Sequence, residues 1–408
     1  MTPAAATPTS LRVLLVLSTL LGFASISTDL YLPALPTMAA ALRADAGMVE
    51  LTIAGYLAGF GAGQLLWGPV GDRYGRRGPV AAGIVLFVIG SAGCAVSASV
   101  WQMIAWRLVQ AAGACSGVVL ARAMVRDLYP HGRAAQMLST LMTVMAVAPL
   151  LGPVIGGQIL VLAGWRAIFW TLVAIGLATL LALFTLPETL PPEARNAEPL
   201  GRAFVRYGEL VRDRAMLGYA GATGFFYAGT FAYVAGTPFA YIAVHHVPPQ
   251  LYGALFALGI VGIMAANLVN ARLVTRLGSD RLLRVGAAVA AMAGVASAVT
   301  AWTGWGGLAG LVGPLFVFVS ATGFIVANSV VGAFALAPQR AGAVSALVGA
   351  VQYGSGMAGS ALVGVFANGT PGPMGWVIAL GGIGSAACAW LLLPAPAAAG
   401  LPEAERTT

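Results

Sequence analysis

The sequence predicts an all-α polytopic membrane protein with twelve transmembrane helices arranged in two six-helix halves. Three observations support this fold class. First, 59% of the 408 residues are hydrophobic and only 8% are charged, which leaves too little polar surface for a water-soluble chain. Second, the apolar runs are each about 20 residues long, the length that one helix needs to cross a bilayer. Third, the arginines gather in alternate connections between these runs.

The apolar runs must be helices, because each unpaired backbone group costs several kcal/mol in lipid. The alternating ten-residue strands of a membrane barrel are absent from the sequence. The first run has no basic segment before it and continues past Leu30, so we expect an uncleaved span rather than a signal peptide. The expected spans are 11–34, 48–70, 79–98, 101–123, 134–160, 166–187, 215–240, 251–272, 281–302, 306–329, 340–364 and 374–395.

All 21 basic residues are arginines, and their distribution predicts the orientation of the chain. If the N-terminus is cytoplasmic, 18 of the 21 lie on the cytoplasmic side, only Arg43 and Arg166 lie on the other side, and Arg107 lies within a span. This asymmetry predicts a multi-pass membrane protein with both termini cytoplasmic. The net charge of +8 does not indicate a nucleic-acid partner, because the arginines lie in short turns between apolar runs.

The proline-rich interval 188–214 has the composition of a linker and divides the chain into residues 1–187 and 215–408. Residues 202–214 are expected to form an amphipathic helix on the membrane surface. The two parts are weakly related, because a shift of 203 residues places Arg73 on Arg276 and Gly75 on Gly278. Asp72 falls on Thr275, so the first half alone keeps the charged turn complete.

Asp29 lies within the first expected span, where an acid costs about 2.5–3.5 kcal/mol and usually faces a cavity. Gly22, Ser25 and Pro33 are expected on the same helix face, at spacings of four and seven residues. We take Asp29 as the one acid placed within a span, able to bind and release a proton. The alternative is that Asp29 lies at the outer end of the span and is solvated.

Two further stretches place unusual residues inside spans. Arg107 and Gln110 are three residues apart and share a helix face, followed by Gly113. The alternative for Arg107 is that it snorkels to a membrane interface near Trp106. In the fifth span a stripe of small residues allows a neighbouring helix to approach closely, and two prolines interrupt its backbone bonds. The residues of this stretch are Ala148, Pro149, Gly152, Pro153, Gly156 and Gly157.

Aromatic and polar residues at helical spacing could line an apolar cavity for a flat hydrophobic ligand, although such a stripe in a membrane helix is more often packing or lipid contact. The expected cavity residues are Tyr56, Gln64, Phe226, Tyr233 and Gln352. The three cysteines lie in apolar runs without paired spacing, which predicts buried thiols rather than a disulfide or a metal site. We expect no metal and no cofactor.

The polar turn at 68–77 resembles the loop between helices 2 and 3 of the major facilitator superfamily, G-x-L-x-D-R-x-G-R-[KR]. A turn that merely collects positive charge would explain its arginines but not Asp72. The residues that fit the pattern are Gly68, Val70, Asp72, Arg73, Gly75, Arg76 and Arg77.

Three other stretches carry the same resemblance. The Arg107 and Gln110 pair resembles R-x-x-Q-G in helix 4, with Ala111 where glycine is usual. The stretch 148–157 resembles the G-P-x-x-G-G motif of the antiporters. The residues Asp29-Leu-Tyr-Leu-Pro-Ala-Leu-Pro resemble the Bcr/CflA branch of drug exporters.

The resemblance implies a rocker-switch carrier that exchanges a proton for a hydrophobic drug, with Asp29 and Arg107 in proton coupling and 68–77 as a gating loop. The resemblance also implies a multi-pass protein of the bacterial inner membrane, and we expect it to act as a monomer in the bilayer. Two alternatives stay open: a carrier of the same fold that moves a sugar or an amino acid, and a polytopic membrane enzyme. The sequence contains none of the common catalytic motifs, which disfavours the enzyme.

Overall fold

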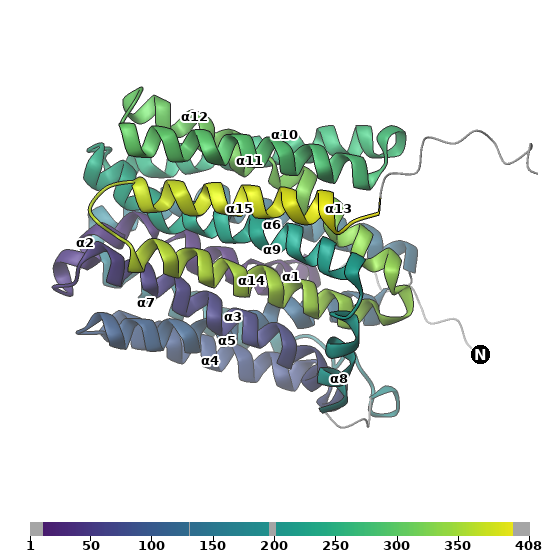
Figure 1. Cartoon of the computed structure of the whole chain (residues 1–408). Coiled ribbons are helices and arrows are strands. Elements are labelled where there is room, and N and C mark those ends of the chain that lie inside the picture. Colours follow the sequence, from purple (N-terminus) through teal and green to yellow (C-terminus); the bar gives the residue numbers. More distant parts are fainter. Residues whose placement is uncertain (1–10, 130, 196–200, 395–408) are drawn as a thin grey trace, which may run out of the picture.

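The computed structural model describes residues 11–129, 131–195 and 201–394, and every element within these ranges is helical (Figure 1). The long helices are α1 (Leu11–Asp29), α3 (Ala46–Tyr74), α4 (Arg77–Val96), α5 (Val100–Leu128), α6 (His131–Ala163), α7 (Trp165–Leu183), α9 (Arg214–Pro238), α10 (Pro249–Leu277), α11 (Ser279–Thr303), α12 (Gly307–Ser320), α13 (Thr322–Leu336), α14 (Ala341–Val365) and α15 (Gly372–Leu391). The short elements are η1 (Leu32–Ala34), α2 (Leu35–Ala41), η2 (Pro192–Ala194), α8 (Gly201–Leu210), η3 (Phe239–Val244) and η4 (Pro338–Arg340).

The protein is an all-α membrane protein with the twelve predicted spans. Eight of the described segments are long and apolar enough to cross a membrane, and two of these eight are the interrupted spans 12–41 and 307–336. The remaining four spans run alongside these eight in the same bundle (Figure 1). They are α3 with 29 residues, α6 with 33, α9 with 25 and α14 with 25.

The first span differs from its prediction, because α1 ends at Asp29 instead of continuing to residue 34. The chain then passes through η1 into α2, and each of these short elements has a proline in its first turn. Proline lacks a backbone N–H and cannot extend the preceding helix. Pro33 therefore does not share a helix face with Asp29, as we had predicted.

The predicted surface helix at 202–214 is shorter than expected. It appears as α8, which ends at Leu210, and α9 begins at Arg214 after a turn. Residues 196–200 of the predicted linker and Arg406 lie outside the described residues.

Glycines allow the long helices to pack closely. Helix α3 packs against α5 and α14, and α9 packs against α14 and α15. A Cβ atom on Gly59 would overlap the backbone of Leu108, and one on Gly359 would overlap the backbone of Ala228. Because lipid provides no hydrophobic force between helices, close van der Waals contact of this kind stabilises the bundle.

The weak sequence repeat has a structural counterpart. Helices α3 and α10 both have 29 residues, and their bounds differ by 203 at each end. The residues that follow them, Gly75 and Gly278, have φ angles of 91° and 78°. Only glycine adopts such angles without strain, so both turns require it.

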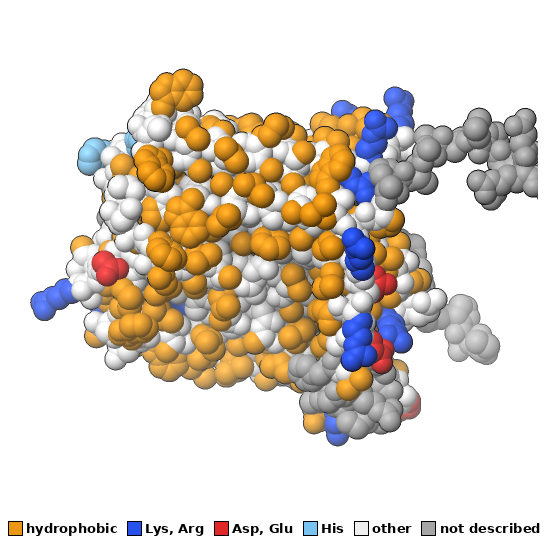
Figure 2. Space-filling view, viewed as in Figure 1, with side chains coloured by type: hydrophobic (Ala, Val, Ile, Leu, Met, Phe, Trp, Pro, Cys, Tyr) orange, Lys and Arg blue, Asp and Glu red, His pale blue; other side chains and the backbone are white. Residues whose placement is uncertain are grey.

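The two ends of the bundle differ in charge. Apolar side chains cover much of the side of the bundle that faces the viewer, and most of the visible arginines gather at one end (Figure 2). We call this end, which contains the turn between α3 and α4, the arginine-rich end. The opposite end contains α2 and the connection from α9 to α10, and we call it the α2 end.

Candidate functional site

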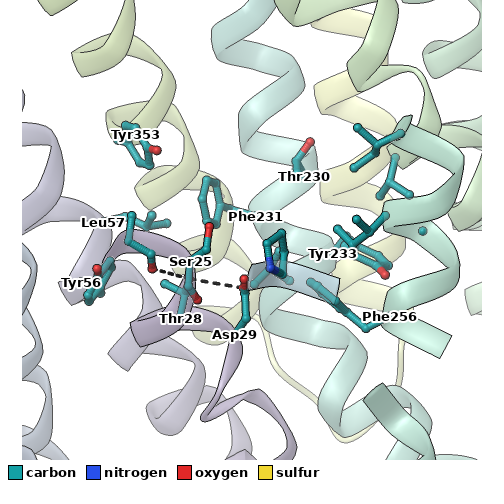
Figure 3. Close-up of a pocket in the computed structure, with 17 residues that line it drawn as sticks. Ser25, Thr28, Asp29, Tyr56, Leu57, Thr230, Phe231, Tyr233, Phe256 and Tyr353 are labelled. Carbon is teal, nitrogen blue, oxygen red and sulfur yellow. Dashed lines mark hydrogen bonds between the residues drawn. The ribbon is translucent and has the colours of Figure 1, made fainter. Parts of the chain in front are cut away.

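A cavity of about 180 Å³ lies between the first helix set (α1–α7) and the second helix set (α9–α15). Residues of α1, α3 and α6 form one side, and residues of α9, α10, α12 and α14 form the other (Figure 3). Most lining residues are apolar or aromatic. Among the lining residues that the structure describes, Asp29 is the only carboxylate, and no basic residue occurs. The other polar groups are Ser25, Thr28, Thr230 and the hydroxyls of Tyr56, Tyr233 and Tyr353.

Asp29 is buried although it is the last residue of α1. Its side chain is 7% exposed, and the hydroxyl of Thr28 donates a hydrogen bond of 3.3 Å to Oδ1 (Figure 3). The alternative of a solvated helix end is therefore wrong. A carboxyl group among aromatic walls at membrane depth is suited to exchange a proton.

Helix α6 holds the end of α1 in place through its small residues. Gly152 lies against Asp29, where an added Cβ would be 2.9 Å from the Asp29 Cβ. Gly156 lies against the carbonyl group of Leu30. Gly157 faces the backbone of Pro249 in α10, at 2.9 Å from the carbonyl oxygen to an added Cβ. The small-residue stripe thus packs both on the acid and on the second helix set.

The two prolines of this stretch lie inside α6. Pro149 lines the cavity and Pro153 is buried. Both leave α6 continuous from residue 131 to residue 163.

Arg107 is fully buried, so the snorkelling alternative is wrong. Its guanidinium carbon lies 4.1 Å from the ring centre of Tyr31 and 4.2 Å from that of Tyr56. Nη1 donates hydrogen bonds to the backbone oxygen of Ser27 at 2.9 Å and to Oε1 of Gln110 at 2.6 Å. Among the described residues Arg107 has no carboxylate partner, and aromatic faces and dipoles stabilise its charge instead.

Tyr56 connects this buried charge to the cavity. One face of its ring lies on Arg107, its hydroxyl is 2.7 Å from the Ser27 hydroxyl, and it also lines the cavity beside Asp29. Arg107 and Asp29 form no ion pair among the described residues, and Tyr56 is the residue that both contacts Arg107 and lines the cavity of Asp29.

The other residues of the helix-4 motif fix α5 to its neighbour α4. Gln110 donates a hydrogen bond of 2.7 Å to the hydroxyl of Ser91. Gly113 lies against the backbone of Phe87, and a Cβ there would be 2.9 Å from the Phe87 Cα.

The predicted gating loop forms a charged network at the arginine-rich end. Arg76 donates to Asp72 at 2.7 Å and to Asp127 at 2.8 Å, which joins the end of α3 to the end of α5. Asp72 is 52% exposed, so its own bond contributes little to stability, whereas the Arg76 side chain is buried. Of the remaining loop residues, Arg73 lies over the ring of Tyr74, Arg77 lies over the ring of Phe184, and Gly68 has no neighbour within 4 Å of an added Cβ.

Glu188, which we did not predict, caps the first turn of α4. It accepts hydrogen bonds from the backbone N–H groups of Arg76 at 2.8 Å and Arg77 at 3.1 Å. Partial burial alone would raise its pKa, but these bonds, with those from Thr189 and Leu190, lower the pKa of Glu188. The negative charge is also favoured by the helix dipole at this N-terminus.

Three predicted cavity residues lie elsewhere. Gln64 packs on Gly349 of α14, and Phe226 stacks on Phe318 with ring centres 5.0 Å apart. Gln352 donates a hydrogen bond of 2.9 Å to Thr223. These side chains join neighbouring helices instead of facing the cavity. Tyr56 and Tyr233 do line it, and the lining aromatic residues that we did not predict are Phe231, Phe256 and Tyr353.

Sequence reasoning also missed Glu50. It is the fifth residue of α3 and is only 4% exposed, so Asp29 is not the one acid placed within a span. Its position inside the apolar run 48–70 was the signal that could have found it. The three cysteines are free, and no described group of side chains could hold a metal ion.

The sequence profile of the Major Facilitator Superfamily matches residues 16–360. The chain belongs to this superfamily. Its members are transporters, so the alternative of a membrane enzyme is wrong.

Individual relatives agree with this assignment. The chain is 37% identical over 371 residues to the "Uncharacterized MFS-type transporter YdgK" of Bacillus subtilis (strain 168), covering 89% of this chain and 92% of that one. It is 31% identical over 347 residues to the "Bicyclomycin resistance protein homolog" of Haemophilus influenzae, covering 85% of this chain and 87% of that one. It is 30% identical over 274 residues to the "Chloramphenicol resistance protein" of Pseudomonas aeruginosa, covering 64% of this chain and 62% of that one. These names are consistent with the Bcr/CflA drug-efflux branch.

Solved transporters share the fold. The E. coli xylose transporter XylE, in a partially occluded inward open conformation, superposes with a TM-score of 0.72 at 16% identity, covering 94% of this chain and 97% of that one. The peptide transporter POT in complex with sulfate gives a TM-score of 0.74 at 15% identity, covering 93% of each chain.

Proposed function

We propose that the protein is a proton-coupled efflux transporter that exports hydrophobic drugs by alternating access. The observation that carries this proposal is the cavity itself, in which one buried carboxylate, Asp29, lies among aromatic walls between the two helix sets. A proton on Asp29 neutralises the cavity, and drug binding then displaces the proton. Each charge moved across 100 mV supplies about 2.3 kcal/mol for export.

The proposal assigns Arg107 to proton coupling through Tyr56. Moving Tyr56 would change both the wall of the cavity and the aromatic face that stabilises the Arg107 charge. A drug that contacts Tyr56 thereby acts on the buried arginine without touching it. Asp72 and Arg76 hold the arginine-rich end of the first helix set together during the cycle.

The arginine-rich end is proposed to face the cytoplasm of a bacterial inner membrane, with both termini on that side. The proposed halves are residues 1–187 and 215–408, joined by the cytoplasmic linker 188–214. Reporter fusions at residues 195 and 245 should fall on opposite sides of the membrane. Reporters on the same side would contradict this topology.

The helix sets meet closely at the α2 end. An added Cβ on Gly47 of α3 would overlap the carbonyl oxygen of Gly364 in α14, and one on Gly253 of α10 would lie 2.6 Å from the backbone nitrogen of Val154 in α6. We infer that this conformation is closed at the α2 end, which is the outer end in the proposed orientation.

A hydrophobic drug fits this cavity better than a sugar does. A sugar needs many hydrogen-bonding groups, whereas the polar groups of the cavity are few and most of its lining is apolar. The relatives named for bicyclomycin and chloramphenicol resistance support the same choice. We propose that one chain is the transporting unit, because the cavity is built from a single chain.

A drug-susceptibility panel in cells that lack their own exporters tests the function. The wild-type protein should raise resistance to several hydrophobic drugs, and a protonophore should remove that resistance. Asp29→Asn should give no resistance at equal membrane abundance. Resistance that a protonophore leaves unchanged would contradict proton coupling, and uptake of sugars without any drug export would favour the metabolite carrier.

A further inference from the structure

Glu50 is a second buried acid, away from the cavity and at the closed end of the bundle. Its side chain is 4% exposed, and its Oε2 atom is buried without a hydrogen-bond partner among the described residues. It is not among the residues that line the cavity. A carboxylate buried without a partner is strongly unfavourable, whereas a neutral carboxylic acid is tolerated. The arrangement around Glu50 therefore suits the protonated side chain.

The position of Glu50 connects it to closure of the α2 end. Glu50 and the cavity residue Leu57 are seven residues apart in α3, so they share one face of that helix about two turns apart. One turn before Glu50, Gly47 packs against the end of α14, where an added Cβ would overlap the carbonyl oxygen of Gly364. Glu50 thus lies in the layer where the first and second helix sets meet, between the cavity and the outer surface.

The charged groups near Glu50 do not neutralise it. Asp45, the residue that caps α3, acts on Glu50 electrostatically and carries the same sign of charge. Neither α2 nor the last two turns of α14 contains an ionisable residue. On the adjacent α5, Arg107 is held between two tyrosine rings. The other ionisable residues among the described residues of this end are Tyr31, Arg43, Cys94, Arg166, Tyr241, His245, His246 and Tyr252.

We propose that Glu50 is a proton-controlled latch, which takes up a proton from the outer side when the α2 end closes and returns it to that side when the end opens. This proposal rests on the alternating access proposed above. Its proton enters and leaves on the same side, so Glu50 sets the conformational equilibrium and does not add to the number of protons exchanged per drug. Because closure requires the protonated acid, alkaline conditions favour the open end.

Distance measurements between spin labels test the latch without any drug. Labels at Ala41 of α2 and Leu251 of α10 occupy exposed positions of the two helix sets at the α2 end. In the wild-type protein, raising the pH should increase the population with the longer distance. For one titrating site the ratio of open to closed molecules should rise by at most about tenfold per pH unit. Glu50→Gln, which cannot lose a proton, should stay at the short distance at every pH.

Two further variants separate Glu50 from its surroundings. Asp45→Asn keeps a capping side chain and should retain the pH response of the wild type. Glu50→Leu, an apolar replacement, should stay closed like Glu50→Gln, which secures the result if one of the two variants folds poorly. In drug-transport assays, Glu50→Gln should slow turnover while the number of protons exchanged per drug stays the same.

The proposal is overturned if Glu50→Gln and Glu50→Leu keep the pH response of the wild type, since the response would then come from other groups such as the two histidines. It is also overturned if the wild-type distance does not change with pH. Because these measurements use no drug, a failed latch is distinguishable from a failed efflux function, which the resistance panel tests separately.

Discussion

Replacing Gly152 by alanine should push the end of α1 away from α6 and impair export while the protein remains folded. The new Cβ would lie 2.9 Å from the Cβ of Asp29. Carbon atoms pack at about 3.5–4.0 Å, so the two helices must separate by about 0.6–1.1 Å. Overpacking of this kind costs about 1–3 kcal/mol. The strain acts on the carboxyl group that we propose as the proton site, so transport should suffer more than stability does.

Two other glycines make this experiment a graded series. At Gly156 an added Cβ would overlap the carbonyl oxygen of Leu30, so Gly156→Ala should be more damaging than Gly152→Ala. Gly313 in α12 has no neighbour within 4 Å of an added Cβ, and Gly313→Ala is the matched control. Alanine favours a helix over glycine by about 1 kcal/mol, so this control should be neutral or stabilising.

The assay combines drug resistance in cells with thermal unfolding of the purified protein. Resistance should decrease in the order Gly313→Ala, Gly152→Ala, Gly156→Ala, and Gly152→Leu should abolish export although the protein still reaches the membrane. If Gly152→Ala and Gly156→Ala confer the same resistance as Gly313→Ala, the packing of α6 on Asp29 is irrelevant to transport and the reasoning fails.

Three more substitutions test the charged groups. Asp72→Asn removes the exposed partner of Arg76 and should slow transport while drug binding and expression stay normal; wild-type rates would count against a gating role. Arg107→Lys keeps the charge but not the planar group that stacks between two rings, so it should lose most export at normal abundance, and full activity would show that stacking is unnecessary. Glu188→Gln should lower the unfolding temperature at neutral pH, because the pKa of Glu188 is held below its ordinary value of 4.5. The stabilisation by ionised Glu188 is fully present above pH 4.5 and is lost as the pH falls through the folded-state pKa. If the unfolding temperatures of wild type and variant still differ in strong acid, this explanation is refuted.

The fold could be predicted because apolar length and arginine placement are properties of local sequence. The break after Asp29 could not be predicted from hydropathy, since Leu30, Leu32 and Leu35 continue the apolar run across it. The prolines of η1 and α2 can be read from the sequence, but a proline can either kink a helix or end it. Which of the two occurs depends on how the neighbouring helices pack against the span. In this structure, α6 packs on the broken end.

The site was predicted in part. Asp29 was recognisable because an acid is rare within a span, whereas Glu50 was missed because it lies near the beginning of one. Arg107 lies between the rings of Tyr31 and Tyr56, which come from two other segments of the chain. A local sequence pattern cannot predict contacts between residues so far apart in the sequence. Phe226 was misplaced because helical spacing gives the members of a face but not the direction in which that face points.

Proton release on drug binding tests the central claim most directly. The measurement uses purified protein in weak buffer, with Glu50→Gln as the background so that only one proposed proton site remains. The account predicts that adding drug to Glu50→Gln releases protons, and that the double variant Asp29→Asn/Glu50→Gln binds neutral drug without releasing any. Equal proton release from both proteins would contradict the account, because the coupling site would then lie elsewhere than Asp29.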